Sequence, residues 1–325
     1  MSKVLFYLAA VLFGVLWCST GAMALTLRTA DIHREGYPTV EAVKYMGKLL
    51  SDRSGGRLSV EVFHSGQLGE EKESLEQCRA GGLDMLRTNL APLVDEVPEA
   101  GVIALPYIFR SEEHLHRVLD GPIGREILDS LEESGLVGLA FYDSGIRSFY
   151  TSQKPLRTIE DFKGMRIRVQ QTELFKAMVE VLGGIPVPMP YGEVQDALRM
   201  GVIDGAENNL PSYHVSGHYT VAKYYSNDGH SMPPEVLVFS KKVWDGLSEE
   251  DRLLILQSAR DSVPYMREKW RAHEDEAQRV LTRAGVQIID SIDREPFIEA
   301  VRPLYDRYSS TPKLLDMVRR IQETQ

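Results

Sequence analysis

The sequence predicts an α/β fold organised as two domains, and three observations lead to that interpretation. Apolar and polar residues alternate over 165–169, and a helix, a second apolar segment and another helix follow. That order is typical of a mostly parallel sheet covered by helices. About 300 residues remain behind a predicted leader segment, which is enough for two domains of ordinary size. An amphipathic pattern over 248–283 predicts a long helix that spans both domains.

The N-terminus predicts an export signal over residues 1–24. Lys3 supplies a positive charge, an apolar run of about 14 residues follows, and Ala22-Met23-Ala24 fits a cleavage site of small residues. The apolar run is shorter than the roughly 20 residues that a spanning helix needs. We therefore expect a periplasmic protein that is cleaved near Ala24 and whose mature chain is not inserted in the membrane.

The first domain begins with three predicted strands separated by two helices, at 25–30, 58–63 and 85–89. Polar groups stand at the end of each strand, namely His33, the 64–71 loop and Asn89. Ligands of open α/β sheets bind beyond the carboxyl ends of the strands, so these groups predict one wall of a cleft. The alternative is that they belong to ordinary solvated loops.

The order of the remaining segments predicts how the chain divides. After a strand over 136–141 the chain is expected to cross into the second domain, and a strand over 236–239 returns it to the first. The long helix is expected to be interrupted near Pro264. The predicted lobes are therefore a first at 25–145 with 235–270 and a second at 146–234 with 271–325.

The second domain is built around 161–213. In its first strand Met165, Ile167 and Val169 face one side, and Arg166 and Arg168 face the other. A helix from about residue 171 ends at Gly183-Gly184, an apolar segment follows at 185–187, and a helix runs from 192 to about 201. A strand and turn over 202–205 then present three polar residues, Glu207, Asn208 and Asn209.

The two arginines of this strand allow two interpretations. Strands of a parallel sheet are buried on both faces, so an arginine there needs a partner. In the first interpretation Arg166 and Arg168 lie at the strand end and point into water. In the second, at least one of them offers its planar pair of donors to the carboxylate of a ligand.

Composition and charge exclude several classes of protein. The chain has 43% hydrophobic and 26% charged residues, as soluble globular proteins do, and its formal charge of −10 argues against nucleic acid as a partner. Cys78 is the single cysteine after the predicted leader, at helical spacing from apolar residues, so we expect a buried thiol and no internal disulfide. His114 and His116 fall on different faces of a helix, so no metal site is expected there.

Signatures of an enzyme or of a cofactor site are missing from the sequence. It contains no GxSxG, HExxH or GxGxxG motif and no phosphate-cradling loop. Asp204 and Glu207 could be imagined as a glycosidase pair, but 47 carboxylates fall near one another by chance. We expect no catalysis and no cofactor, and an enzyme acting on sugar acids stays a minor alternative.

The segment GMRIRVQQTELFKAMVEVLGGIPVPMPYGEVQDALRMGVIDGAENN closely resembles the signature of the solute-binding proteins of tripartite ATP-independent periplasmic (TRAP) transporters, the DctP-like family. LGEEKE at 68–73 and SKKVWDGLSEEDR at 240–252 extend the likeness from Leu25 to the C-terminus. The resemblance implies two α/β lobes that close on a ligand like a clamshell, braced by a long helix. It also implies delivery of the ligand to separate membrane permease subunits, without catalysis; a periplasmic ligand sensor of the same fold is a lesser alternative.

The resemblance also implies which residues bind the ligand. Arg168 matches the arginine that pairs with a ligand carboxylate, and Arg147 matches a second ligand-contacting arginine. Asn208 matches an asparagine at the carboxylate, and Tyr191 an aromatic that packs on the ligand. Gln171 and Asn89 match positions that vary with the ligand. Arg166 more often aligns with a lysine, which favours a structural or surface role.

The combination of DIH followed by YP, RTNLAP, two glutamines after the arginine strand and GAENN is most similar to members that bind hexuronates such as D-glucuronate and D-galacturonate. A uronate has one carboxylate and several hydroxyls, which suits a polar opposite wall of His33, Glu71, Glu73 and Asn89. A C4-dicarboxylate or another sugar acid is the alternative, because Arg147 could bind a second carboxylate. Leu210, where relatives often have tryptophan, departs from the pattern.

Overall fold

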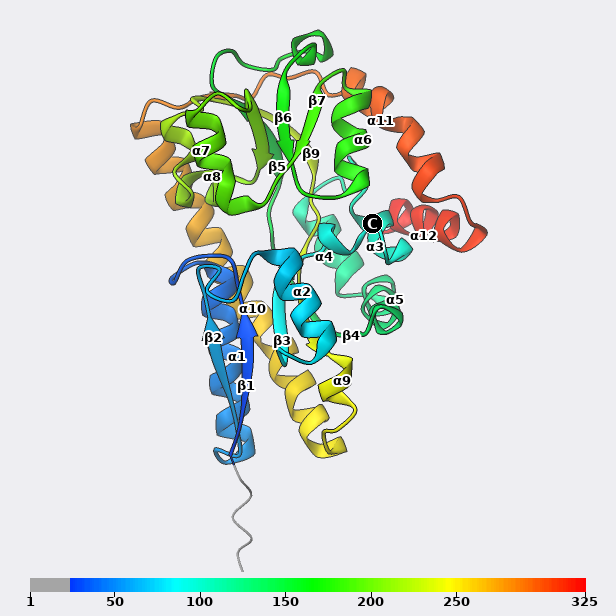
Figure 1. Cartoon of the computed structure of the whole chain (residues 1–325). Coiled ribbons are helices and arrows are strands. Elements are labelled where there is room, and N and C mark those ends of the chain that lie inside the picture. Colours follow the sequence, from blue (N-terminus) through cyan, green and yellow to red (C-terminus); the bar gives the residue numbers. More distant parts are fainter. Residues whose placement is uncertain (1–23) are drawn as a thin grey trace, which may run out of the picture.

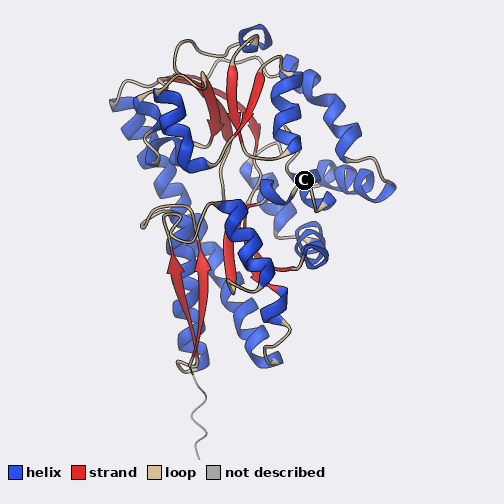
Figure 2. Ribbon diagram, in the orientation of Figure 1, coloured by secondary structure: helices blue, strands red, loops and turns tan. Residues whose placement is uncertain are grey.

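The computed structural model describes residues 24–325, which form two lobes, each around its own β-sheet (Figure 1). The first lobe holds a five-stranded sheet of order β2-β1-β3-β10-β4, and the second a six-stranded sheet of order β11-β9-β5-β8-β6-β7. Helices surround both sheets (Figure 2). The predicted fold class, an α/β protein of two lobes, is confirmed.

The sheet of the first lobe combines parallel and antiparallel strands. β1 pairs in parallel with both β2 and β3, whereas β10 runs antiparallel to β3 and β4. The bounds of these strands are β1 Leu25–Ala30, β2 Leu58–Phe63, β3 Met85–Asn89, β4 Leu136–Tyr142 and β10 Glu235–Ser240. Helices of this lobe are α1 Pro38–Ser54, α2 Glu71–Ala80, α3 Pro98–Ile103, α4 Glu112–Leu119, α5 Pro122–Ser130 and α9 Lys241–Trp244.

Helix α1 shows how local signals place an element against the sheet. Pro38 fits the first turn of the helix, because a backbone N–H at that position would have no acceptor within the helix. Gly55 ends the helix in the left-handed conformation at φ 61°. Val43, Met46 and Leu50 are buried at helical spacing. A side chain at Gly47 would meet Val60 of β2 at 2.8 Å, so glycine there allows the helix to lie close to the strand.

The second lobe contains the predicted succession of parallel strands and helices. β6 pairs in parallel with β7 and β8, while β5 runs antiparallel to β8 and β9. The strands are β5 Arg147–Thr151, β6 Arg166–Val169, β7 Ile185–Pro188, β8 Gly205–Asn208, β9 Tyr224–Ser231 and β11 Gln287–Ile289. The helices are α6 Glu173–Val181, α7 Val194–Arg199 and α8 Leu210–Val215. The predicted strand at 202–205 is wrong in its bounds: β8 begins at Gly205 and itself contains Glu207 and Asn208.

Two chain crossings and one helix join the lobes. The chain passes from β4 to β5 through 143–146 and returns from β9 to β10 through 232–234. Helix α10, Glu249–Arg283, packs on α1 and β4 in the first lobe and on α8 in the second (Figure 1). The expected interruption at Pro264 is wrong, because the helix is continuous over 35 residues with Pro264 inside it.

The last two helices lie along one side of both lobes (Figure 1). α11, Glu295–Tyr308, contacts α6 and α3, and α12, Pro312–Glu323, contacts α3 and α5. Their apolar faces join a core that continues from one lobe into the other. Within residues 24–325 no helix is both long enough and apolar enough to cross a membrane. The predicted leader, 1–24, lies outside the described residues except for Ala24.

Candidate functional site

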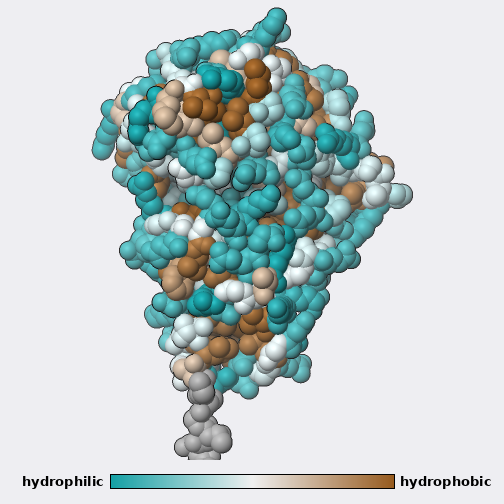
Figure 3. Space-filling view, viewed as in Figure 1, coloured by the Kyte–Doolittle hydropathy of each residue, from teal (hydrophilic) through white to brown (hydrophobic). Residues whose placement is uncertain are grey.

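A cavity between the lobes collects the ends of strands from both sheets. It is a small polar space of about 310 Å³, part of which is open to solvent. From the first lobe it is lined by Ile32, His33, Glu71, Asn89 and Glu235, and from the second by Arg147, Arg168, Gln170, Tyr191, Asn208, Asn209 and Ser212. Seven of the nine predicted site residues line it. The surface around the junction of the lobes is largely hydrophilic on the face that Figure 3 shows.

Arg147, the first residue of β5, is held in place by partners within the second lobe. Its Nε donates to Glu207 Oε2 at 2.5 Å, its Nη2 to Glu207 Oε1 at 2.8 Å and its Nη1 to Asn208 Oδ1 at 2.8 Å. Both side chains are buried, and the charge of Glu207 offsets that of Arg147. Asn208 Oδ1 accepts from Arg147 Nη1 and from the backbone N–H of Asn209, and within residues 24–325 its amide nitrogen makes no hydrogen bond, so it can donate to a ligand in the cavity.

Arg168 on β6 differs from Arg147 in having no carboxylate partner. Its Nε and Nη2 both donate to the carbonyl oxygen of Met189, at 2.9 and 2.7 Å. Its exposure is 3%, and among residues 24–325 it forms no ion pair. Burial lowers the pKa of this guanidinium, against the opposing effect of Glu207 and Tyr150. A buried cation with spare donors is therefore turned toward the cavity.

Arg166 of the same strand behaves as the first interpretation of the arginine pair predicts. Its side chain is 42% exposed and makes a two-point ion pair with Asp204, at 2.7 and 3.0 Å. The two arginines lie on the same face of β6 but differ in depth along it, because Arg166 is the partly exposed first residue of the strand while Arg168, two residues further on, is buried near the end that faces the first lobe.

Two of the predicted site residues lie outside the cavity. Glu73 is exposed and its carboxylate accepts from the backbone N–H of Glu70, as part of the cap of α2. Gln171 is exposed and lines the hollow at the opening between the lobes, whereas its neighbour Gln170 lines the cavity itself, with its Nε2 3.4 Å from Asn89 Oδ1. The two glutamines are adjacent in the sequence, and the turn between β6 and α6 determines which of them reaches the cavity.

Asn89 and Tyr191 line the cavity but are also bound to other parts of the chain. Asn89 Nδ2 lies 3.1 Å from Glu235 Oε1 and 3.3 Å from Ser144 Oγ, and its Oδ1 accepts from the backbone N–H of Ala91. Asn89 therefore ties β3 to the segment that crosses between the lobes. The hydroxyl of Tyr191 donates to the carbonyl of Ser212 at 3.1 Å, which leaves its ring facing the cavity.

His33 is an uncharged member of the first-lobe wall. Its ring stacks on Tyr37 with centroids 3.8 Å apart, and the side chain is buried. Burial, together with the nearby charge of Arg87, holds the pKa of His33 well below its ordinary value. Tyr37 in turn contacts the second lobe, because its hydroxyl lies 2.9 Å from Ser212 Oγ.

Arg87 and Glu235 are two residues that the sequence analysis missed. Arg87 on β3 is fully buried; its Nε and Nη2 donate to Asp31 and its Nη1 donates to Glu235 Oε2 at 2.5 Å. Glu235 begins β10 and lines the cavity. An acidic residue directly before the apolar run Val236–Phe239 was the available signal, since a carboxylate at the start of a buried strand needs a partner.

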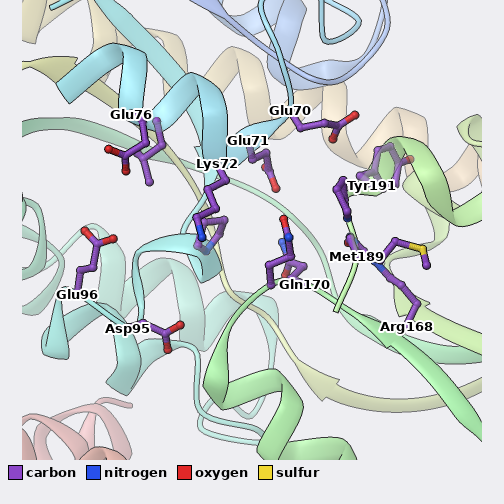
Figure 4. A pocket seen from close by; sticks show the side chains of 14 residues that line it. Glu70, Glu71, Lys72, Glu76, Asp95, Glu96, Arg168, Gln170, Met189 and Tyr191 are labelled. Atoms are coloured by element: carbon purple, nitrogen blue, oxygen red, sulfur yellow. Dashed lines mark hydrogen bonds between the residues drawn. The ribbon is translucent and has the colours of Figure 1, made fainter. Parts of the chain in front are cut away.

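The cavity continues into a hollow of about 640 Å³ at the opening between the lobes. Figure 4 shows Glu71 and Lys72 of α2, with Glu70 directly before the helix, on one side of it, facing Arg168 and Tyr191 of the second lobe. Among residues 24–325 no three potential ligands are placed to hold a metal ion.

His230 is buried behind Arg147 and belongs to its supporting network. Its Nδ1 lies 2.8 Å from Asp228 and its Nε2 3.5 Å from Glu207. Burial would lower the pKa of His230, but the carboxylates of Asp228 and Glu207 outweigh it and raise the pKa to about 9. Burial likewise opposes ionisation of Glu207, yet Arg147 and His230 hold its pKa at about 2. The histidine is thus a charged structural partner.

We expect the stability of the protein to fall as the pH rises from about 6.5 through about 9. Because the pKa of His230 is higher in the folded chain than in the unfolded chain, binding of the proton stabilises the fold. This stabilisation is complete below the pKa of an unfolded histidine, about 6.5, and is lost as His230 deprotonates near pH 9. The wild type should therefore lose roughly 2–3 kcal/mol of unfolding free energy relative to His230→Gln over this interval. Urea unfolding of both proteins across the pH range measures the difference, and parallel curves would contradict the assignment.

Comparisons with known proteins agree with the geometry. A family model described as "Bacterial extracellular solute-binding protein, family 7" (DctP) matches residues 29–311. A solute-binding protein of Chromohalobacter salexigens is 38% identical over 98% of this chain and 96% of its own length. A TRAP periplasmic solute-binding protein from Bradyrhizobium sp. BTAi1, in complex with α/β-D-galacturonate, is 50% identical, with a TM-score of 0.91 over 92% of this chain and 100% of that chain.

Two structures of a TRAP solute-binding protein from Citrobacter koseri differ in how well they match. The form with bound D-glucuronate has a TM-score of 0.89 at 38% identity, over 93% of this chain and 100% of that chain. The apo, open form has a TM-score of 0.81 at 37% identity, over 92% and 99%. The lobes of the present chain are therefore arranged more like those of the liganded form.

Proposed function

We propose a hexuronate, D-glucuronate or D-galacturonate, as the ligand of this chain, which belongs to the DctP family of bacterial extracellular solute-binding proteins and is a solute-binding protein of a TRAP transporter. The observation that carries the proposal is Arg168, a buried cation without an ion-pair partner in the described chain, at one end of a small polar cavity. The relatives from Bradyrhizobium and Citrobacter, which bind galacturonate and glucuronate, support it.

In the proposed complex the carboxylate of the ligand pairs with Arg168 and lies within reach of the Asn208 amide. The guanidinium of Arg147 adds a fixed positive charge at the cavity, but most of its hydrogen-bond donors are already used by Glu207. Tyr191 packs on the sugar, and His33, Glu71 and Asn89 face its hydroxyls. Charge-assisted bonds of this kind recover the solvation that a carboxylate loses on burial.

We propose further that the lobes open and close about the two chain crossings and α10, and that the closed form docks on the membrane permease. The proposed lobes are those predicted, at 25–145 with 235–270 and at 146–234 with 271–325, with one change. Helix α12 contacts α3 and α5, so we assign it to the first lobe. The export signal with cleavage near Ala24 completes the proposal and places the mature protein in the periplasm.

A thermal-shift panel of organic acids on the mature protein, residues 25–325, tests the ligand. D-Glucuronate and D-galacturonate should raise the melting temperature, because a ligand at a thousandfold excess over Kd adds ~4 kcal/mol to the unfolding free energy. Succinate, malate, sialate and 2-oxo acids at the same concentration are the comparison. A shift with succinate or malate and none with either uronate would contradict the proposal and leave a dicarboxylate as the ligand.

A further inference from the structure

The first-lobe wall of the cavity is made largely of carboxylate oxygens, and it faces the arginines of the second lobe. We infer that Glu71 and Glu235 restrict this site to acids with a single carboxylate, because they accept hydroxyl groups and repel a second carboxylate. The inference rests on the proposed function and adds to it two residues that set specificity. Its support is the placement of these two side chains and the balance of charge between the two walls.

Both carboxylates are fixed at the cavity and keep acceptor capacity. Glu71, the first residue of α2, accepts from the backbone N–H of Asn89 through Oε1 at 3.0 Å. Glu235 is 5% exposed and accepts from Arg87 through Oε2 and from Asn89 Nδ2 through Oε1. An ionised carboxylate has about four acceptor positions and no donor, so each can still accept from a ligand hydroxyl but can donate nothing to a ligand carboxylate.

Arg87, the cation behind this wall, does not reach the cavity. Its side chain is completely buried, its Nε and Nη2 are used by Asp31, and its Nη1 is used by Glu235 and lies 3.8 Å from Glu71. One guanidinium thus serves three carboxylates, which leaves the first-lobe side with an excess of negative charge. His33 adds no positive charge there, because its pKa is well below the ordinary value.

The second-lobe wall has the opposite balance. Glu207 offsets Arg147, and Arg168 remains without an ion pair in the described chain. A ligand with one carboxylate and several hydroxyls matches both walls. A ligand with carboxylates at both ends would place the second one against Glu71 and Glu235, where like charges disfavour each other's ionisation. Burial and Glu235 already raise the pKa of Glu71, against the lowering effect of Arg87.

The test compares acids that share a carbon skeleton and differ at one end. D-Galactonate and galactarate are both open chains of six carbons, and galactarate carries a second carboxylate where galactonate has a CH₂OH group. Calorimetric Kd values for these two acids and for D-galacturonate should be measured on the wild type, Glu71→Gln and Glu235→Gln. We expect galactarate to bind the wild type roughly 100-fold more weakly than galactonate. Glutamine keeps the size of glutamate and one acceptor oxygen but removes the charge. The ratio of the galactarate Kd to the galactonate Kd should therefore fall at least tenfold in one or both variants.

A matched variant separates a local effect from a change in total charge. Glu61→Gln on β2 removes one negative charge from an exposed position of the same lobe and should leave the ratio unchanged. Where galactonate binds too weakly to measure, the ratio is taken against galacturonate. Galactarate that binds the wild type as tightly as the reference acid, or a ratio that neither glutamine variant changes, would overturn the inference while leaving uronate binding intact. Failure of both uronates to bind the wild type would instead overturn the proposed function.

Discussion

Arg168→Met should abolish binding of D-glucuronate and D-galacturonate at micromolar concentrations. Removing one partner of a buried ion pair costs about 3–5 kcal/mol, which corresponds to a rise in Kd of roughly 10²–10³ or more. Methionine keeps most of the side-chain volume, so the effect reports the lost charge and donors. Isothermal titration calorimetry of each uronate against the wild type and the variant measures it.

The same substitution should not destabilise the protein without ligand. Within residues 24–325 the buried side chain of Arg168 has the carbonyl of Met189 as its one hydrogen-bond acceptor, so its charge lowers the stability of the empty site. We therefore expect the melting temperature of the ligand-free variant to equal or exceed that of the wild type, while the increase caused by a uronate disappears. A residue that acts mainly in folding would show the reverse pattern.

Arg166→Met is the matched control for this experiment. It removes the same charge from the same strand, two residues away, but from a side chain that is 42% exposed and paired with Asp204. An exposed ion pair contributes at most about 1 kcal/mol to stability, and Arg166 does not line the cavity, so affinity should stay within about threefold of the wild type. Near-native binding by Arg168→Met, or equal losses in both variants, would show that Arg168 is not the anchor of the carboxylate.

Arg87→Met should produce the largest loss of stability among single substitutions at the site. It leaves Asp31 and Glu235 buried without their shared cation, with Glu71 beside them. Breaking a buried pair in this way costs about 3–5 kcal/mol of unfolding free energy. Urea unfolding at neutral pH measures the loss, and ligand affinity should fall as well because Glu235 and Asn89 lose their fixed positions.

The pH dependence and a control sharpen this second prediction. The loss should become smaller as the pH is lowered, because the orphaned carboxylates can then bind protons, and burial already raises the pKa of Asp31 and of Glu71. Arg28→Met on the neighbouring strand β1 removes a guanidinium that is 49% exposed and 3.9 Å from Asp84, and should change stability by at most about 1 kcal/mol. Equal losses for the two variants would mean that the buried network does not stabilise the first lobe.

Local sequence patterns predicted most of the elements because they depend on near neighbours in the chain. Alternation over 165–169 predicted β6, and Gly183-Gly184 predicted the end of the next helix, α6, whose last residue is Val181. Periodicity did not predict where β8 begins, because the end of a strand depends on its pairing with a neighbouring strand. It also did not predict that α10 continues through Pro264, because packing can hold a long helix together around a proline.

The family, the two-lobed α/β fold and the arginine that we propose binds the carboxylate were all predicted from the sequence, because motif order and alternation are properties of adjacent residues. Which polar groups face the cavity depends instead on contacts between distant parts of the chain. Glu235 meets Arg87 and Asn89 across 148 and 146 positions of the chain, through the antiparallel pairing of β10 with β3. The order of strands in a sheet sets such contacts, and no local pattern reports it. For the same reason Gln170 rather than Gln171 lines the cavity between the lobes, and the two arginines of β6 differ, with Arg166 paired with Asp204 and Arg168 left for a ligand.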